Sequence, residues 1–198
     1  MRQSGAAARA LVAQQLRDSA RVKETLADSG AELIARMGER LIEALEAGGK
    51  VVFCGNGGSA ADAQHLAAEL VGRFRRERRA LPALALTDNT SILTAVGNDY
   101  GYERVFVRQV EALVGEGDVV VGISTSGNSA SVLAALRLAR ARGATCLGLS
   151  GRDGGALVGL CDLCLVVPAT DTARIQEAHI AVGHVLCDLV ESAFAESD

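Results

Sequence analysis

The sequence of 198 residues contains no tryptophan and two prolines, and its aromatic residues make up only 3% of the chain. Sites that hold nucleic-acid bases or sugars by stacking them on aromatic rings therefore have almost no material here. A carbohydrate ligand would have to be held by hydrogen bonds. Long apolar runs are also missing: runs such as residues 51–54 and 119–121 stop at a glycine, far short of the ~18 residues that span a bilayer.

An excess of positive charge is missing as well. The chain has 20 basic and 24 acidic residues and a formal net charge of −4, which does not favour general nucleic-acid binding. The one basic cluster, Arg73 to Arg79, follows a predicted helix, and we interpret it as a solvated helix end whose dipole favours cations. Capture of a phosphate or a contact with a partner is the alternative.

The N-terminal segment also lacks the clean apolar core of a secretory signal, because Arg2, Arg9 and Arg17 interrupt it. The five cysteines are an odd number, which fits free thiols in a reducing compartment better than a disulfide framework. We therefore expect a cytoplasmic protein. Cys161 and Cys164 form an isolated C-x-x-C without a second pair to complete a zinc site, and we interpret both as inert core thiols.

Two kinds of pattern divide the chain. Residues 6–47 are rich in alanine, leucine, glutamate and arginine with apolar residues at helical spacing, and Gly48 and Gly49 end this segment. Short apolar runs then alternate with glycine-rich loops and helical patterns, which predicts a parallel sheet covered on both faces. We expect a single domain over residues 1–198, made of an N-terminal helical segment, 1–48, and an α/β core, 49–198.

Within that core, strands are predicted over residues 51–54, 119–123, 145–149 and 163–167. Helices are predicted from about residue 60, from about residue 130 and over residues 174–194. The apolar face of the last helix is broader than one contact with a sheet requires. This width predicts that the helix also packs against another subunit.

Two loops rich in glycine and serine follow predicted strands: GNGGS at residues 55–59 and STSGNS at residues 124–129. Ligands of open α/β sheets bind at the carboxyl ends of the strands, where both loops should lie. Small residues let the backbone approach an anion, and the N–H groups that open the following helix are unpaired donors. The two loops therefore indicate a phosphate site, although neither matches a P-loop or a dinucleotide fingerprint. Tight turns alone are the alternative for either loop.

Histidine and glutamate residues form the second candidate constellation. His65 and Glu69 are four residues apart on a predicted helix, so they share one face and could bind a divalent metal such as zinc or form a base with its neighbour. A surface ion pair is the alternative. On the last helix, Gln176 and His184 differ by about 80° and stand about 12 Å apart along the axis. They could share an ion only if the helix begins after Gln176, or with help from loops or a neighbouring subunit. His184 by itself could equally be a core residue.

Four motifs in order give the chain a resemblance to a known family. They are GNGGS with Asp62, His65 and Glu69; GNDYG at residues 97–101; the serine loop; and RIQEAH at residues 174–179 with His184. Together they resemble sugar isomerase (SIS) domain proteins of the phosphoheptose isomerase type over essentially the whole chain. The resemblance implies a flavodoxin-like, three-layer α/β/α fold, with N-terminal helices that pack at the interface of a cytoplasmic homotetramer.

The resemblance also implies an activity: the interconversion of sedoheptulose 7-phosphate and D-glycero-D-manno-heptose 7-phosphate through an enediol, with one zinc ion per subunit. Glu69 is expected as the base and His184 as the acid. The metal ligands implied are His65, Glu69, Gln176 and His184. The substrate contacts implied are Asn56, Gly57, Gly58, Glu69, Asn98, Asp99, Ser124, Thr125, Ser126, Ser129 and Gln176.

A non-enzymatic SIS protein of the replication-initiator-associating type is the main alternative. That protein shares the fold and the loops but acts through protein contact, and it replaces the second histidine of the C-terminal helix. The presence of His184 therefore favours the enzyme. A regulatory module would need a further domain, for which 198 residues leave no room.

Overall fold

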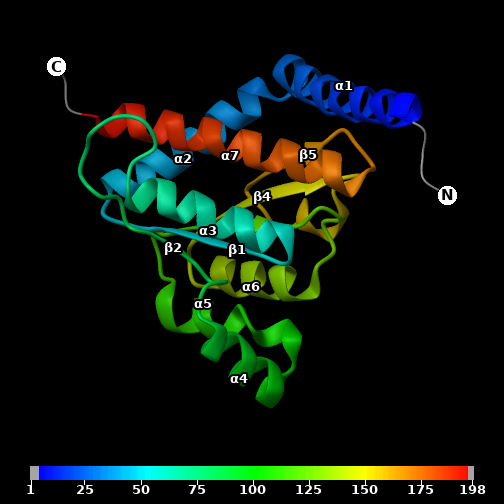
Figure 1. Cartoon of the computed structure of the whole chain (residues 1–198). Coiled ribbons are helices and arrows are strands. Elements are labelled where there is room, and N and C mark those ends of the chain that lie inside the picture. The colour runs from blue at the N-terminus through cyan, green and yellow to red at the C-terminus, as the bar shows by residue number, and fades with distance from the viewer. Residues whose placement is uncertain (1–4, 196–198) are drawn as a thin grey trace.

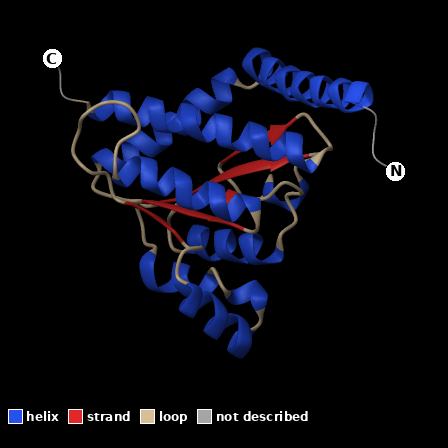
Figure 2. Ribbon diagram, viewed as in Figure 1, coloured by secondary structure: helices blue, strands red, loops and turns tan. Residues whose placement is uncertain are grey.

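The computed structural model describes residues 5–195 and has five parallel strands between two layers of helices (Figures 1 and 2). The strands are β1 Val51–Gly55, β2 Ala83–Ala85, β3 Val119–Ile123, β4 Thr145–Gly151 and β5 Leu163–Val167. Their spatial order is β2-β1-β3-β4-β5, the doubly wound order of flavodoxin-like folds. The predicted fold class is confirmed.

Seven α-helices and two 3₁₀ turns surround these strands in the described residues. The helices are α1 Gly5–Ser29, α2 Ala31–Glu46, α3 Gly58–Val71, α4 Thr90–Tyr100, α5 Val107–Leu113, α6 Ala130–Ala141 and α7 Thr172–Phe194. The turns are η1 Tyr102–Arg104 and η2 Gly155–Leu157. No helix within residues 5–195 is long and apolar enough to span a membrane.

Alternating side chains of the strands fill two separate cores. Phe53 of β1 points into the core formed with α2, α3 and α7, and Cys54 points into the core formed with α5 and α6. All five residues of β1 and of β3 are buried, which explains why their sequences are continuously apolar and do not alternate with polar residues. The same arrangement brings α3 and α7 side by side over one face of the sheet (Figure 1).

The N-terminal helical segment is divided at Gly30. A Cβ at this position would stand 3.0 Å from the Leu26 carbonyl oxygen and 3.5 Å from Leu165 Cδ1, so the chain turns where it approaches the sheet closely. The second helix, α2, then packs on the sheet, while α1 extends beyond it (Figure 1).

Three elements were not predicted from the sequence: β2, α4 and α5. β2 is three residues long and has no β-branched residue. No residue of α4 is fully buried, and Leu93 and Val96 pack partly buried against the second core. Asn89 caps the helix by accepting a hydrogen bond from the Ile92 N–H at 3.0 Å. The predicted strands at residues 119–123 and 163–167 and the predicted start of α6 agree with the structure.

Candidate active site

The two predicted ligand loops meet at the carboxyl ends of β1 and β3, neighbouring strands at the point where the strand order reverses. Asn56 connects them: its side-chain amide donates to Ser129 Oγ at 2.8 Å and to Ser131 Oγ at 3.0 Å. Its carbonyl Oδ1 accepts a hydrogen bond from the Tyr102 hydroxyl at 2.9 Å. Ser131 and Tyr102 were missed from the sequence, although Tyr102 directly follows the GNDYG motif.

The backbone of both loops requires glycine. Gly57, at the start of α3, has a φ of +58°, and a Cβ on Gly58 would stand 2.6 Å from Gln176 Nε2. Gly127 has a φ of +65°, and a Cβ there would stand 1.9 Å from the Gly154 carbonyl oxygen. The positive φ of Gly57 and Gly127 and the close approach of Gly127 to the Gly154 backbone therefore require glycine, whereas at Gly58 the flexible Gln176 side chain could move aside.

The polar groups of the serine loop differ in their surroundings. Ser124 is buried, whereas Thr125, Ser126 and Ser129 are partly exposed. Ser129 is the N-cap of α6, but its hydroxyl makes no cap hydrogen bond and instead accepts from Asn56. The loop thus combines exposed hydroxyls with the N–H groups that open α6, an arrangement suited to an anion.

Asn98 and Asp99 lie on the exposed helix α4, and the Asn98 amide donates to Asp99 Oδ1 at 2.8 Å. The hydrogen bond that links this segment to the loops comes from Tyr102.

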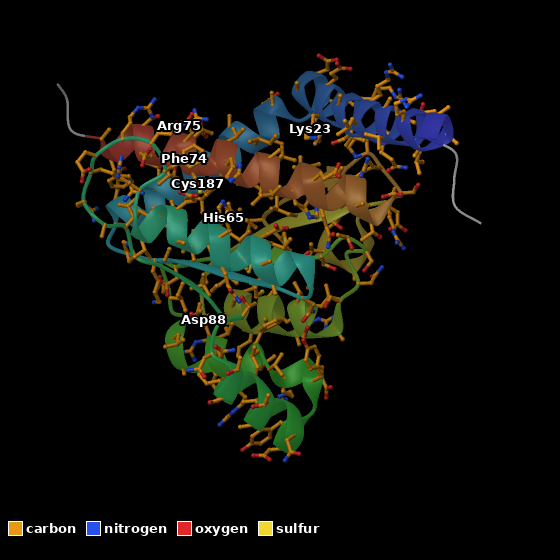
Figure 3. The ribbon with its side chains drawn as sticks, viewed as in Figure 1. Lys23, His65, Phe74, Arg75, Asp88 and Cys187 are labelled. Carbon is orange, nitrogen blue, oxygen red and sulfur yellow. The ribbon has the colours of Figure 1, made fainter. Side chains whose placement is uncertain are left out.

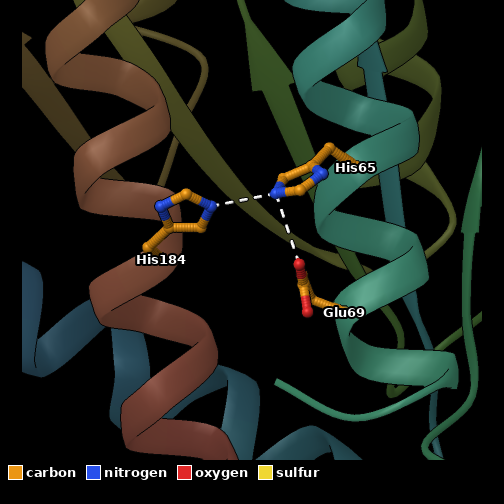
Figure 4. Close-up of side chains that lie close together, drawn as sticks. All are labelled: His65, Glu69 and His184. Carbon is orange, nitrogen blue, oxygen red and sulfur yellow. Dashed lines mark hydrogen bonds and ion pairs between the residues drawn. The ribbon is translucent and has the colours of Figure 1, made fainter. Parts of the chain in front are cut away.

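His65, Glu69 and His184 gather between α3 and α7 (Figure 4). His65 Nε2 lies 2.9 Å from His184 Nε2 and 3.3 Å from Glu69 Oε1. The i, i+4 spacing on α3 places the first two side chains on one face, and α7 brings the third from a distant part of the sequence. The structure therefore brings together three of the four implied metal ligands.

These three donors fit a transition metal such as zinc. One ligand atom from each residue lies within 4.8 Å of the other two. A tetrahedral zinc ion with bonds of about 2.0–2.2 Å spaces its ligand atoms by roughly 3.3–3.5 Å, close to the two separations given above. Half of the His65 side chain is exposed, so the cluster is open to solvent on one side.

Gln176, the fourth implied ligand, lies on α7 two turns before His184 and is not part of this cluster. α7 begins at Thr172, where Asp171 accepts from the N–H groups of Ala173 and Arg174, so the alternative that the helix begins after Gln176 is wrong. An uninterrupted helix separates Gln176 from His184 by about 12 Å along its axis. The Gln176 amide instead faces Gly58, at the start of α3.

The other histidine of α7, His179, is a core residue. It is fully buried, and its Nε2–H donates to the Ser150 carbonyl oxygen at 2.9 Å. Burial lowers the pKa of His179, a shift that the hydrogen bond to Ser150 partly opposes. The two histidines of α7 thus have different roles, which their surroundings decide.

The arginine-rich segment is a loop that follows α3, leads to β2 and packs against the C-terminal part of α7. Glu191, which is fully buried, accepts hydrogen bonds from the N–H groups of Phe74, Arg75 and Arg76 at 2.6–2.8 Å. Its Oε1 also lies 3.5 Å from Arg78 Nε. Anchored in this way, the loop stacks the Phe74 ring on the His184 ring, with centroids 5.5 Å apart. Phe74 and Arg75 of the loop and His65 of α3 are labelled in Figure 3.

The interpretation of this cluster as a solvated helix end is wrong for Arg78. Its side chain is fully buried, and its guanidinium donates to the carbonyl oxygens of Gly72, Arg79 and Glu69. Arg73 and Arg75, in contrast, remain exposed. The sequence could not separate these residues, because burial of Arg78 depends on the distant Glu191.

Comparisons with known proteins agree with this fold. A family model described as the SIS domain matches residues 14–151. Phosphoheptose isomerase from Roseiflexus sp. (strain RS-1) is 58% identical over 185 residues, which cover 93% of this chain and 94% of that protein. The phosphoheptose isomerase from Geobacter sulfurreducens is 59% identical over 180 residues, covering 91% of this chain and 95% of that protein.

Two solved structures are similar over nearly their whole length. The phosphoheptose isomerase from Neisseria gonorrhoeae superposes with a TM-score of 0.88 at 46% identity and covers 93% of this chain and 98% of that one. The enzyme from Francisella tularensis gives a TM-score of 0.90 at 37% identity with the same coverage.

The doubly wound sheet, the two loops at its switch point and the family model define a SIS-domain protein. The sequence identity to phosphoheptose isomerases and the structural similarity to two of them narrow this class to one family. The chain belongs to the phosphoheptose isomerase family.

Proposed function

We propose that the protein is a sedoheptulose 7-phosphate isomerase, which interconverts D-sedoheptulose 7-phosphate and D-glycero-D-manno-heptose 7-phosphate. The observation that carries this proposal is the convergence of His65, Glu69 and His184 in a member of the phosphoheptose isomerase family. The non-enzymatic alternative lacks the second of these histidines and so does not account for the cluster.

The phosphate of the substrate is assigned to the serine loop. Ser124, Thr125, Ser126 and Ser129 supply hydroxyl groups, and the N–H groups that open α6 add unpaired donors with a favourable dipole. Asn56, Gly57 and Gly58 line the neighbouring loop, where Asn56 is already fixed by Ser129 and Ser131. We keep Asn98, Asp99 and Gln176 as proposed substrate contacts. Binding at the phosphate end orients the reacting end of the sugar.

An aldose–ketose isomerisation moves a proton between C1 and C2, so it needs a base above the carbon and an acid at the oxygens. We assign the Glu69 carboxylate as the base. Its Oε1 faces His65 at 3.3 Å, so Oε2 is the atom assigned to take the proton. His184 is assigned as the acid, with its ring held by the stacked Phe74.

We further propose that the cluster binds one zinc ion, with His65, Glu69, His184 and Gln176 as ligands. A His184 nitrogen that ligates zinc could not also donate a proton, so the ligand role and the acid role of His184 are alternatives, which the zinc measurement below separates. Bound zinc would supply Lewis-acid polarisation of the substrate carbonyl. Since α7 separates Gln176 from His184, Gln176 could complete the coordination only from a second copy of the chain.

Assembly into a homotetramer with active sites between subunits is part of the same proposal. α1 exposes Leu11, Val12 and Leu16, and α7 exposes Val185 and Leu189. A groove of about 390 Å³ lies between α1, α2 and α7, and nearly all of its lining is apolar. A second copy would bury these surfaces, in agreement with the broad apolar face predicted for the last helix. We also propose that the protein acts in the cytoplasm.

The test is incubation of the purified protein with sedoheptulose 7-phosphate, with and without added zinc or a chelator, followed by NMR detection of the aldose. We expect the Glu69→Gln and His184→Ala variants to lose about 10²- to 10⁴-fold in turnover while they remain folded. Glu77→Gln is the matched control, because the Glu77 side chain is 87% exposed and outside the cluster.

Measurement of bound zinc in the same variants separates the two roles of His184. Loss of zinc together with activity in His184→Ala would identify a ligand, and loss of activity with zinc retained would identify the acid. Near-normal turnover in Glu69→Gln or His184→Ala would refute the assignment, and absence of aldose from the zinc-loaded protein would favour the binding protein.

A further inference from the structure

Cys161 and Cys164 form a pair of thiols that the isomerase chemistry does not use. The sequence interpretation treats them as inert core residues, but both are only partly buried, whereas Cys54, Cys146 and Cys187 are buried. Cys161 follows the 3₁₀ turn η2, and Cys164 lies in β5, at one edge of the sheet. All five cysteines are free.

The two sulfur atoms occupy a space that Gly148 leaves open. Strand pairing puts Gly148 of β4 directly beside Cys164 of β5. A Cβ on Gly148 would stand 2.7 Å from Cys164 Sγ and 2.8 Å from Cys161 Sγ. Because both sulfurs lie so close to one point, they are no more than 5.5 Å apart, the sum of these two distances.

The intervening turn holds this arrangement. Asp162 donates its N–H to the Cys146 carbonyl oxygen at 2.8 Å, and its carboxylate accepts the Cys146 N–H at 2.8 Å. The Cys161 N–H donates to the Leu157 carbonyl oxygen at 3.2 Å. The chain therefore bends between the two cysteines, so that Cys161 returns toward Cys164 and the pair is ordered before any reaction.

The two thiols also differ in acidity. The neighbouring Cys164 thiol and burial raise the pKa of Cys161. The neighbouring Cys161 thiol lowers the pKa of Cys164, although burial opposes the shift. Cys164 is therefore the thiol more readily converted to the nucleophilic thiolate.

We propose that Cys161 and Cys164 are a redox-active dithiol that closes to an intramolecular disulfide by exchange with a small-molecule disulfide such as oxidised glutathione. The Cys164 thiolate attacks one sulfur of the small disulfide, forming a mixed disulfide and releasing one small thiolate. Cys161 then loses its proton and attacks Cys164 Sγ, which releases the second small thiolate. The protein loses two electrons and two protons, and the small disulfide is reduced to two thiols.

The experiment treats the reduced full-length protein with oxidised glutathione, quenches with acid and alkylates the remaining thiols. Trypsin cuts after Arg152 and Arg174, so Cys161 and Cys164 fall in one peptide, and Cys146 falls in another. We expect the peptide of residues 153–174 to lose two hydrogens and resist alkylation, while the peptide with Cys146 is alkylated. This readout does not depend on isomerase activity, so its failure is distinct from failure of the proposed function.

Two variants and a control sharpen the test. In Cys161→Ser, Cys164 should retain one glutathione as a stable mixed disulfide, because the resolving thiol is missing. In Cys164→Ser, glutathione should be taken up much more slowly, and Cys146→Ser should behave as the unaltered protein. Cys161→Ala replaces the serine variant if that variant does not fold. Full alkylation of the 153–174 peptide, a stable glutathione adduct on the unaltered protein, or a disulfide to another cysteine would overturn the proposal.

Discussion

Removal of the Glu191 carboxylate should destabilise the protein strongly, because several groups far apart in sequence depend on it. The side chain is fully buried, accepts three backbone N–H groups from the loop after α3, and pairs with the fully buried guanidinium of Arg78. Glu191→Ala leaves that charge and those donors without their partner. Breaking a buried pair from one side costs about 3–5 kcal/mol. In a domain of this size, that loss lowers the Tm by roughly 6–20 °C.

Asp188→Ala is the matched control, since it removes another carboxylate of α7 that pairs with exposed arginines of the same loop. Surface pairs of this kind contribute about 0–1 kcal/mol. Urea unfolding and thermal melts of both variants give the comparison. A Glu191→Ala protein within about 1 kcal/mol of the Asp188→Ala protein would refute the claim that Glu191 anchors the loop.

The same anchor predicts a dependence on pH. Burial by itself would raise the pKa of Glu191, but the three N–H donors and Arg78 lower it below its ordinary value. A carboxyl whose folded pKa is depressed stabilises the protein above its unfolded pKa, about 4.3, and this contribution is lost as the pH falls through the folded pKa. Glu191→Gln should therefore lose less stability on acidification than the unaltered protein.

Two further predictions concern the core and the serine loop. Burial lowers the pKa of His179, so the folded protein favours the neutral imidazole. The stability that this group contributes should be full above about pH 6.5 and decline below it. Urea unfolding at pH 7 and pH 5 should therefore show a smaller decline in stability for His179→Gln than for the unaltered protein, and equal declines would contradict this. Gly127→Ala forces a Cβ against the Gly154 carbonyl oxygen at a positive φ, so it should lower the free energy of unfolding in urea by at least about 1–3 kcal/mol. Gly115→Ala is the control, because Gly115 lies in open space at a negative φ and its substitution should cost much less. Equal losses of stability in the two variants would contradict this reasoning.

Local patterns in the sequence predicted the parts of the fold that depend on neighbouring residues. The continuous apolar runs gave the strands at residues 119–123 and 163–167, and glycine and serine marked both loops at the switch point. The four-residue spacing of His65 and Glu69 gave their shared face. Each of these signals lies within one short segment.

Features that depend on contacts between distant segments could not be predicted in this way. His179 and His184 are five residues apart on one helix, and only the packing of α7 decides that one is buried against Ser150 and the other meets His65. In the sequence, Arg78 cannot be distinguished from the exposed arginines beside it, because its buried partner Glu191 is more than a hundred residues away. The α4 helix has only a short apolar pattern, Ile92, Leu93 and Val96, and Leu93 and Val96 are only partly buried against the core, so the signal in its sequence is weak.

The central claim, that Glu69 moves a proton between two carbons of a sugar phosphate, is tested most directly by running the reaction in D₂O. The account predicts that the unaltered protein forms aldose with deuterium at C2, and that Glu69→Gln, folded and loaded with zinc, incorporates none above background. Deuterium incorporation by Glu69→Gln at the rate of the unaltered protein would contradict it.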